Sequence, residues 1–215
     1  MARILRVMGV LLLMLVTPVS AEHSPHYDVA CPTGSADIVL DPGHGGADPG
    51  AVNEAYNLYE RDLNLEIALS TAAILENDYG YRVALTREDN ETELANSERG
   101  EIANACGAVV VILIHLNAST DTNANYSQTF WGEKEKDLLL SLVIGQSLEP
   151  LGIPVKNVDR FDNGGLLRAR MPSVLVEAVF MSNPDEAKEL ASGTRQDEIA
   201  EVIAVGIDTW MHERD

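Results

Sequence analysis

The unbroken apolar run from Ala108 to Ile114 restricts the fold of this chain more than any other feature. A strand without polar alternation must be buried on both faces, and such strands occur in sheets that helices cover on both sides. Shorter runs, rich in apolar and β-branched residues and bounded by turn residues, have the same character. They predict further strands over Asp37–Asp41, Tyr81–Thr86, Ser127–Trp131 and Ser173–Val179.

Apolar residues at helical spacing separate these predicted strands. The spacing predicts helices over about Asp62–Asp78 and Thr92–Cys106, another between Leu140 and Leu151, and a closing helix from Ile199 to Trp210. Strands that alternate with helices build a sheet between two helical layers. The predicted fold class is therefore α/β, a three-layer sandwich, and 215 residues suffice for one such domain.

The first residues have the pattern of a secretory signal peptide. Arg3 and Arg6 precede an apolar run, and small residues end the segment at Ala21. The run is shorter than the roughly 20 residues of a membrane span, although retention as an anchor is an alternative to cleavage. In either case we expect the rest of the chain to be exported, to the periplasm or the extracellular space. We divide the chain into a signal peptide (1–21), a linker (22–35) and one folded domain (36–215).

The composition is strongly acidic, with a formal net charge of −19. Such a chain is a poor partner for nucleic acid, whose binding depends on neutralising phosphates, and for an anionic membrane surface. We attribute most of the charge to solubility, and no basic binding patch is evident along the sequence. We therefore expect no nucleic-acid partner and no membrane contact beyond the signal segment.

Two cysteines, Cys31 and Cys106, lie in the part expected to be exported. An even number of cysteines in an oxidising compartment permits one disulfide, which would close a long loop of the fold. Because a disulfide requires close and suitably oriented residues, the sequence leaves this pairing open.

Polar side chains interrupt the predicted core strands at three places. His44 follows the first strand, His115 ends the long apolar strand, and Glu177 lies inside another strand. Taken singly, each histidine has a structural reading as a hydrogen-bonded loop residue, and Glu177 has one as the partner of Arg168 or Arg170. Taken together they favour a site, because ligands bind at the carboxyl ends of strands in α/β sheets. A buried carboxylate is also costly unless it is paired or binds a metal, and its pKa rises toward the range of a general base.

Imidazole groups suit zinc, and a catalytic zinc usually has three protein ligands and one open position. The spacing alone leaves the third ligand open among Glu54, Glu60 and Glu66. Glu60 is the best placed of the three, because it comes just before a predicted helix whose N-terminal end would face the strand ends.

The order of motifs resembles the zinc-dependent N-acetylmuramoyl-L-alanine amidases of the type called amidase 3. The resemblance extends from Ile38 to about Trp210, and a run of ordered motifs is far more specific than any one of them. The matching residues are Ile38–Gly46 (IVLDPGHGG), Glu60–Leu65 (ERDLNL), Leu85–Arg87 (LTR), Leu94, Arg99, Ala103–Asn104, Ile114–Ala118 (IHLNA), Leu167–Arg168, Met171–Pro172, Val174–Glu177 (VLVE), Phe180, Ser182 and Asn183.

The resemblance implies that His44, Glu60 and His115 bind Zn²⁺ and that Glu177 is the catalytic carboxylate. It implies a twisted, mostly parallel sheet of about six strands between helices, with 36–215 as an amidase catalytic domain. The implied reaction is hydrolysis of the peptidoglycan amide between N-acetylmuramic acid and L-alanine of the stem peptide, by a water that the zinc activates.

Two other functions stay open at this point. A zinc peptidase or deacetylase could use the same groups on another cell-wall amide, and a wall-binding protein could have lost catalysis. We expect a monomer, and the sequence does not identify a protein activator or recruiter. Some relatives carry a long helical insert that covers the zinc site. The stretch from Ala118 to Glu133 is too short and polar for such a helix, so an open site is expected.

Overall fold

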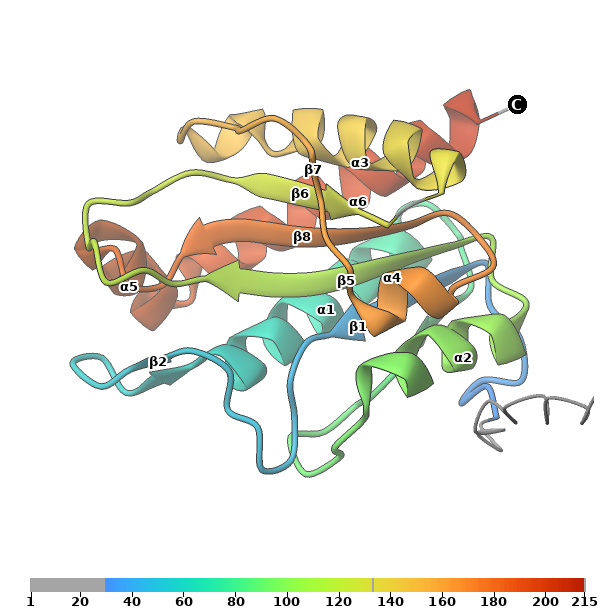
Figure 1. Ribbon diagram of the computed structural model, residues 1–215, viewed down its shortest axis with the longest axis horizontal. Coiled ribbons are helices and arrows are strands. Elements are labelled where there is room, and N and C mark those ends of the chain that lie inside the picture. Colours follow the sequence, from blue (N-terminus) through green and yellow to red (C-terminus); the bar gives the residue numbers. More distant parts are fainter. Residues whose placement is uncertain (1–29, 133, 215) are drawn as a thin grey trace, which may run out of the picture.

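The computed structural model describes residues 30–132 and 134–214. A six-stranded sheet forms the centre of the fold (Figure 1). Its strands occur in the order β4 (Val83–Leu85), β1 (Ile38–Pro42), β5 (Val110–Asn117), β8 (Ser173–Phe180), β6 (Gln128–Trp131) and β7 (Asp159–Arg160). The first four strands in this order are parallel, β6 is antiparallel to β8, and β7 is parallel to β6.

Helices cover both faces of the sheet. In Figure 1, α2 (Asn96–Cys106) and α4 (Gly164–Arg168) lie in front of it, whereas α1 (Glu60–Asn77) and α6 (Thr194–Glu213) lie behind it. The rear layer also includes α3 (Glu135–Ser147), the short 3-10 helix η1 (Glu149–Leu151) and α5 (Pro184–Ser192). A small hairpin of β2 (Val52–Asn53) and β3 (Leu58–Tyr59) precedes α1. The predicted three-layer α/β fold with a mostly parallel sheet is confirmed.

Alternate residues of the central strand β5 face opposite helical layers, because successive side chains of a strand point to opposite faces. Ile112 and Ile114 pack with the rear helices, whereas Val111 and Leu113 pack with α2 and α4. The residues from Val110 to Ile114 are at most 1% exposed. The long apolar run is therefore the doubly covered centre of the sheet, as its composition predicts.

All four predicted helices begin at residues other than those predicted. α1 begins at Glu60 rather than Asp62, and α2 begins at Asn96 rather than Thr92. α3 begins at Glu135 rather than Leu140, and α6 begins at Thr194 rather than Ile199. The side chain of Asp89 accepts hydrogen bonds from the backbone N–H groups of Glu91 and Thr92, which keeps this segment in a turn. The later start of α2 follows from this local competition for backbone donors.

A disulfide joins Cys31 to Cys106, the last residue of α2. It spans 75 residues of sequence and ties the segment before β1 to the front helical layer. The predicted signal peptide and most of the predicted linker lie outside the described residues. None of the helices within the described ranges combines the length and apolarity needed to cross a membrane.

We expect the double substitution Cys31→Ser, Cys106→Ser to lower the free energy of unfolding by about 2–4 kcal/mol. The physical reason is that the unfolded chain gains entropy when a closed loop of 75 residues is released. Denaturant titration with and without a reductant measures the effect, and the double variant serves as the reductant-insensitive control. Equal stability of the oxidised wild-type chain and the double variant would contradict the expectation.

Candidate metal centre and its pocket

The candidate site lies where the front helical layer leaves the sheet uncovered. On β5, His115 follows Leu113 on the front face, and on β8, Glu177 follows Leu175 on the same face. Leu113 and Leu175 are buried in the front core, whereas the two polar residues line a pocket of about 340 Å³. The strand register pairs His115 directly with Glu177. Neighbouring strands therefore place an imidazole and a carboxylate side by side on one face.

The loop after β1 brings His44 to the same pocket. His44 has a left-handed backbone conformation, with φ 63°, which non-glycine residues seldom adopt. Gly43 packs directly on the imidazole of His115, so that a Cβ at this position would lie 2.2 Å from its Cε1. A glycine before His44 is therefore required for the two imidazoles to approach, and their ring centroids are 4.9 Å apart.

Two buried arginines hold this loop by its backbone. Arg99 of α2 donates to the carbonyl oxygens of Pro42 at 2.9 Å and of His44 at 2.8 Å, and it forms an ion pair with buried Asp41. Arg87 donates to the carbonyl oxygens of Pro42 and Gly43. These contacts offset the cost of the unusual backbone at His44. Arg99 is thus a structural anchor of this loop, and buried Asp41 pairs with it.

Glu60 is the first residue of α1, and its carboxylate joins the two imidazoles. Oε1 of Glu60 lies 3.1 Å from Nε2 of His44 and 3.1 Å from Nδ1 of His115. The three ligand atoms all lie within 4.8 Å of one another. A metal with ligand distances of about 2.1 Å and tetrahedral angles separates its ligand atoms by about 3.4 Å, so the spacing fits one ion.

The surrounding hydrogen bonds orient these atoms as metal ligands. Asp48 lies 2.8 Å from Nδ1 of His44, which favours a proton on Nδ1 and leaves the lone pair of Nε2 directed at Glu60. The backbone N–H of Ala51 donates to Oε2 of Glu60, and that of Leu116 donates to Oε1. A carboxylate held in this way keeps its position without the help of the imidazoles. The donor set therefore fits a divalent cation that accepts nitrogen and oxygen ligands.

The charges of the site favour ionised Glu60. Burial raises the pKa of Glu60, but hydrogen bonds and charges from His115 and His44 outweigh it and lower this pKa well below its usual range. Burial lowers the pKa of His44, whereas Glu60 and Asp48 raise it, and the net direction is upward. The lowered pKa of Glu60 and the raised pKa of His44 have the same cause, because the Glu60 carboxylate lies where it stabilises positive charge between the imidazoles.

Glu177 has the properties of a proton acceptor beside this centre. Burial, together with the negative charge of Glu60, raises the pKa of Glu177 to about 7, although a hydrogen bond from the Asn117 amide opposes the shift. The Oδ1 of Asn117 accepts from the backbone N–H of Ala118, which turns its NH₂ group toward Glu177. Among the described residues, no ion pair joins Glu177 to Arg168 or Arg170, so its structural reading as an arginine partner is wrong.

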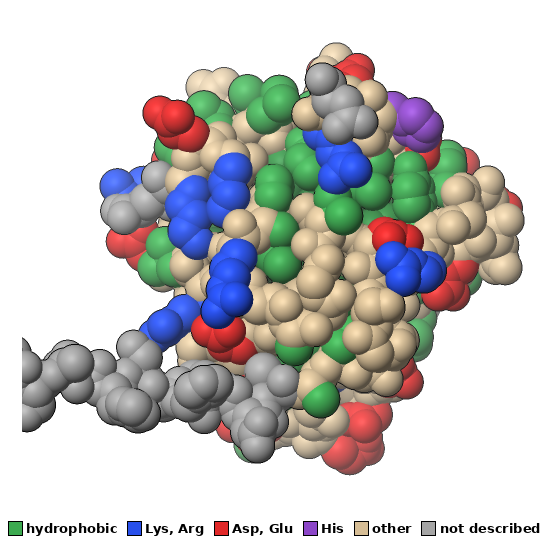
Figure 2. Space-filling view, turned by 90° about the vertical axis from the view of Figure 1, so that its right-hand side faces the viewer, with side chains coloured by type: hydrophobic (Ala, Val, Ile, Leu, Met, Phe, Trp, Pro, Cys, Tyr) green, Lys and Arg blue, Asp and Glu red, His purple; other side chains and the backbone are tan. Residues whose placement is uncertain are grey.

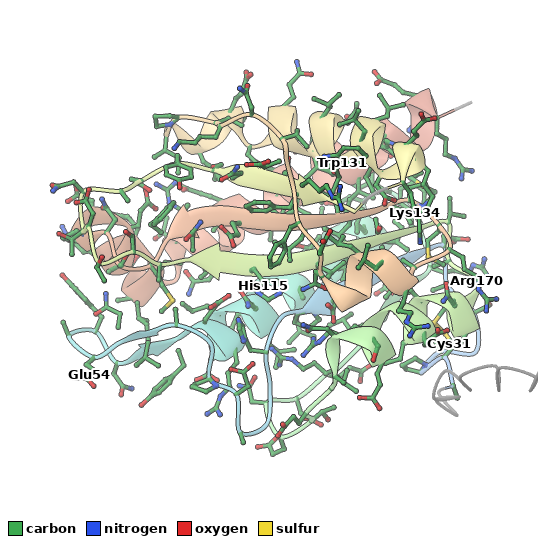
Figure 3. All side chains as sticks on the ribbon, in the orientation of Figure 1. Cys31, Glu54, His115, Trp131, Lys134 and Arg170 are labelled. Atoms are coloured by element: carbon green, nitrogen blue, oxygen red, sulfur yellow. A yellow bond between two sulfur atoms is a disulfide. The ribbon has the colours of Figure 1, made fainter. Side chains whose placement is uncertain are left out.

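The other two candidate ligands lie elsewhere. Glu54 lies in the β2–β3 hairpin, well away from His115 in Figure 3. Glu66 is exposed on α1 and accepts from Gln196 of α6, in the rear layer. The structure therefore brings His44, Glu60, His115 and Glu177 together and leaves Glu54 and Glu66 out. Metal binding by His44, Glu60 and His115 and catalysis by Glu177 stay predictions.

Sequence reasoning missed part of the pocket. Asp48 contacts His44, and Phe161 and Asn163 line the pocket from the segment before α4. Phe161 is 46% exposed and packs against Phe130, with ring centroids 5.7 Å apart. An isolated Asp in a glycine-rich loop or an isolated Phe in a short connection has no periodic signal. Only the fold shows that these side chains border the site.

Comparisons with known proteins agree with this architecture. The family model for N-acetylmuramoyl-L-alanine amidase, amidase 3, matches residues 38–209. A germination-specific N-acetylmuramoyl-L-alanine amidase of Bacillus subtilis is 31% identical over 194 residues, which cover 82% of this chain and 80% of that protein. A Haemophilus influenzae protein named probable N-acetylmuramoyl-L-alanine amidase AmiB is 30% identical over 220 residues. That match covers 79% of this chain but only 51% of the relative, so the chain spans about half the length of that protein.

A solved structure has the same fold. The N-acetylmuramoyl-L-alanine amidase from Clostridium difficile 630 superposes with a TM-score of 0.79 at 28% identity, covering 85% of this chain and all of that one. The family match extends from the first residue of β1 into α6 and includes every residue of the candidate centre. The chain belongs to the N-acetylmuramoyl-L-alanine amidase family called amidase 3.

Proposed function

We propose that this chain hydrolyses the peptidoglycan amide between N-acetylmuramic acid and L-alanine of the stem peptide, with zinc bound by His44, Glu60 and His115. The observation that carries the proposal is the convergence of Nε2 of His44, Oε1 of Glu60 and Nδ1 of His115 beside Glu177 in one pocket. Two imidazoles and one carboxylate form a ligand set typical of catalytic zinc, which keeps a further position open.

Each protein group has a distinct role in this reaction. Zinc, when bound, supplies a Lewis acid that polarises the amide carbonyl and lowers the pKa of water. Glu177 accepts the proton of the attacking water and later transfers it to the nitrogen of the leaving L-alanine. The Asn117 amide holds the Glu177 carboxylate through its hydrogen bond, so that the carboxylate stays directed at the pocket. Asp48 keeps the His44 imidazole in its ligand orientation.

The domain organisation and the compartment belong to the same proposal. Residues 36–215 form the catalytic domain, and residues 1–21 direct export to the space that contains peptidoglycan. The Cys31–Cys106 disulfide supports this placement, because disulfides persist in oxidising compartments. Between β5 and β6, residues 118–127 form a loop without a helix, which supports an open site that acts without removal of a covering segment.

Product analysis tests the proposal. Purified peptidoglycan is digested with the chain from residue 22 onward, with and without a chelator, and the chain's metal content is measured. We expect about one zinc per chain and chelator-sensitive release of stem peptides that begin with a free L-alanine amino group.

The alternatives give different products. Cleavage within the stem peptide would support a zinc peptidase, and free acetate would support a deacetylase. Wall binding without metal or cleavage would support a binding protein that lacks catalysis. Any of these results would contradict the amidase proposal.

A further inference from the structure

A basic patch lies beside α4, although no such patch is evident along the sequence. We define it as Lys134, Lys136, Arg168 and Arg170. The ammonium of Lys134 donates to the carbonyl oxygens of Leu167 at 2.8 Å and Ala169 at 2.7 Å, and that of Lys136 donates to the carbonyl of Met171. Folding therefore brings cations from two separate segments around the end of α4. Figure 2 views the molecule from the right-hand side of Figure 1, and several Lys and Arg side chains gather in the left part of this view.

The two arginines of the patch have no carboxylate partner among the described residues. Both are exposed, and only their backbone groups are bonded, the Arg168 carbonyl and the Arg170 N–H to the side chain of Asn104. Among the nearby carboxylates, Asp137 is buried and binds Lys136, Glu101 accepts from Asn104, and exposed Glu135 lies between the two lysines in sequence. In a chain with 34 acidic and 15 basic residues, two nearby exposed arginines without a carboxylate partner among the described residues give a local positive charge that suits an anion.

Helix α4 connects this patch to the catalytic pocket. Asn163, which lines the pocket, caps the N-terminus of α4 by accepting from the N–H of Gly165 at 2.7 Å. Arg168 is the last residue of α4, so the helix rises only about 7.5 Å between the two. In Figure 3, α4 lies between His115 and the labelled Lys134 and Arg170. An extended peptide of three or four residues, at about 3.3 Å per residue, covers this distance.

We propose that Arg168 and Arg170 bind carboxylates of the peptidoglycan stem peptide while its first amide occupies the pocket. This inference rests on the proposed function, because it requires peptidoglycan as the substrate. The planar guanidinium matches a carboxylate with two parallel hydrogen bonds. The patch is small and the chain has a formal net charge of −19, so a short peptide with a few carboxylates fits it better than a long polyphosphate, which needs an extended basic surface.

Binding to purified wall tests the inference. The double variant Arg168→Gln, Arg170→Gln is compared with the control Lys188→Gln, Arg214→Gln, which removes the same charge from other exposed positions. Both are made in a Glu177→Gln background so that the wall stays intact, and their melting temperatures are matched first. The wall is stripped of phosphate polymers and used before and after amidation of its stem carboxylates.

We expect the arginine variant to bind the untreated wall about tenfold more weakly at low salt, and the control to change less than about twofold. Amidation should weaken the parent by the same factor and leave the arginine variant unchanged. In the chain with Glu177 intact, the arginine substitutions should not alter cleavage of an uncharged N-acetylmuramoyl-L-alanine amide.

Equal binding by the arginine and control variants would overturn the inference. So would binding that ignores amidation but responds to added phosphate polymer, which would identify a phosphate ligand instead. Failure of the amidase proposal has another signature. In that case the wild-type chain releases no alanine-ended peptides, whereas binding still depends on the arginines and on the wall carboxylates.

Discussion

We expect Glu177→Gln to reduce the rate of amide cleavage by about 10³-fold, which is within the usual range for removal of a general base. Glutamine preserves the size of the side chain but cannot accept the proton of the attacking water. The raised pKa of Glu177, about 7, indicates an environment that tolerates both protonation states near neutral pH, as proton transfer in two directions requires. The measurement is the initial rate of release of alanine-ended peptides from purified peptidoglycan.

The metal content separates a catalytic role from a structural one. Glu177 is not among the three grouped ligand atoms, so the variant should bind as much metal as the wild-type chain. Glu76→Gln, an exposed substitution of the same kind on α1, should leave both activity and metal content unchanged. A Glu177→Gln variant that retains most of its cleavage rate would show that another group accepts the proton.

We expect His115→Ala to weaken metal binding by more than about 100-fold, because a ligand is lost rather than one of its supporting contacts. Amide cleavage should fall with the bound metal. His115 supplies Nδ1 to the centre from the middle of the sheet, and no other imidazole of the described residues besides His44 lies in the group of ligand atoms. The measurement is metal content after dialysis against a zinc buffer, followed by titration of activity with added zinc.

The matched control is His212→Ala. His212 is exposed near the end of α6 and does not line the pocket, so its removal should change neither metal binding nor cleavage. Thermal unfolding in the presence of a chelator checks that both variants fold. If His115→Ala bound metal as tightly as the wild-type chain, His115 would not be a metal ligand and the proposed three-residue ligand set would be wrong.

Much of the fold follows from local patterns in the sequence. Long apolar runs predict β5 and β8, and helical spacing predicts α1 and α6, because burial on one or two faces imposes a period on many successive residues. Short elements escape this reasoning. The two-residue strands β2, β3 and β7 and the five-residue helix α4 contain too few residues for a period to emerge.

The candidate site shows the same division. His115 and Glu177 can be recognised without knowledge of the fold, because they are polar residues in apolar strand sequences. Spacing leaves the third ligand open, and the start of α1 brings Glu60, rather than Glu54 or Glu66, to 3.1 Å from both imidazoles. Asp48 has no such mark, because its contact with His44 depends on the path of a loop.

The sequence by itself determined the doubly covered sheet, the family resemblance and the polar residues that interrupt the core, because each of these is carried by neighbouring residues. Only the tertiary structure decided which face those residues share, which glutamate meets the histidines, that Cys31 pairs with Cys106, and that four cations gather beside α4. These features depend on strand register and on the packing of layers, which bring together side chains from distant parts of the chain.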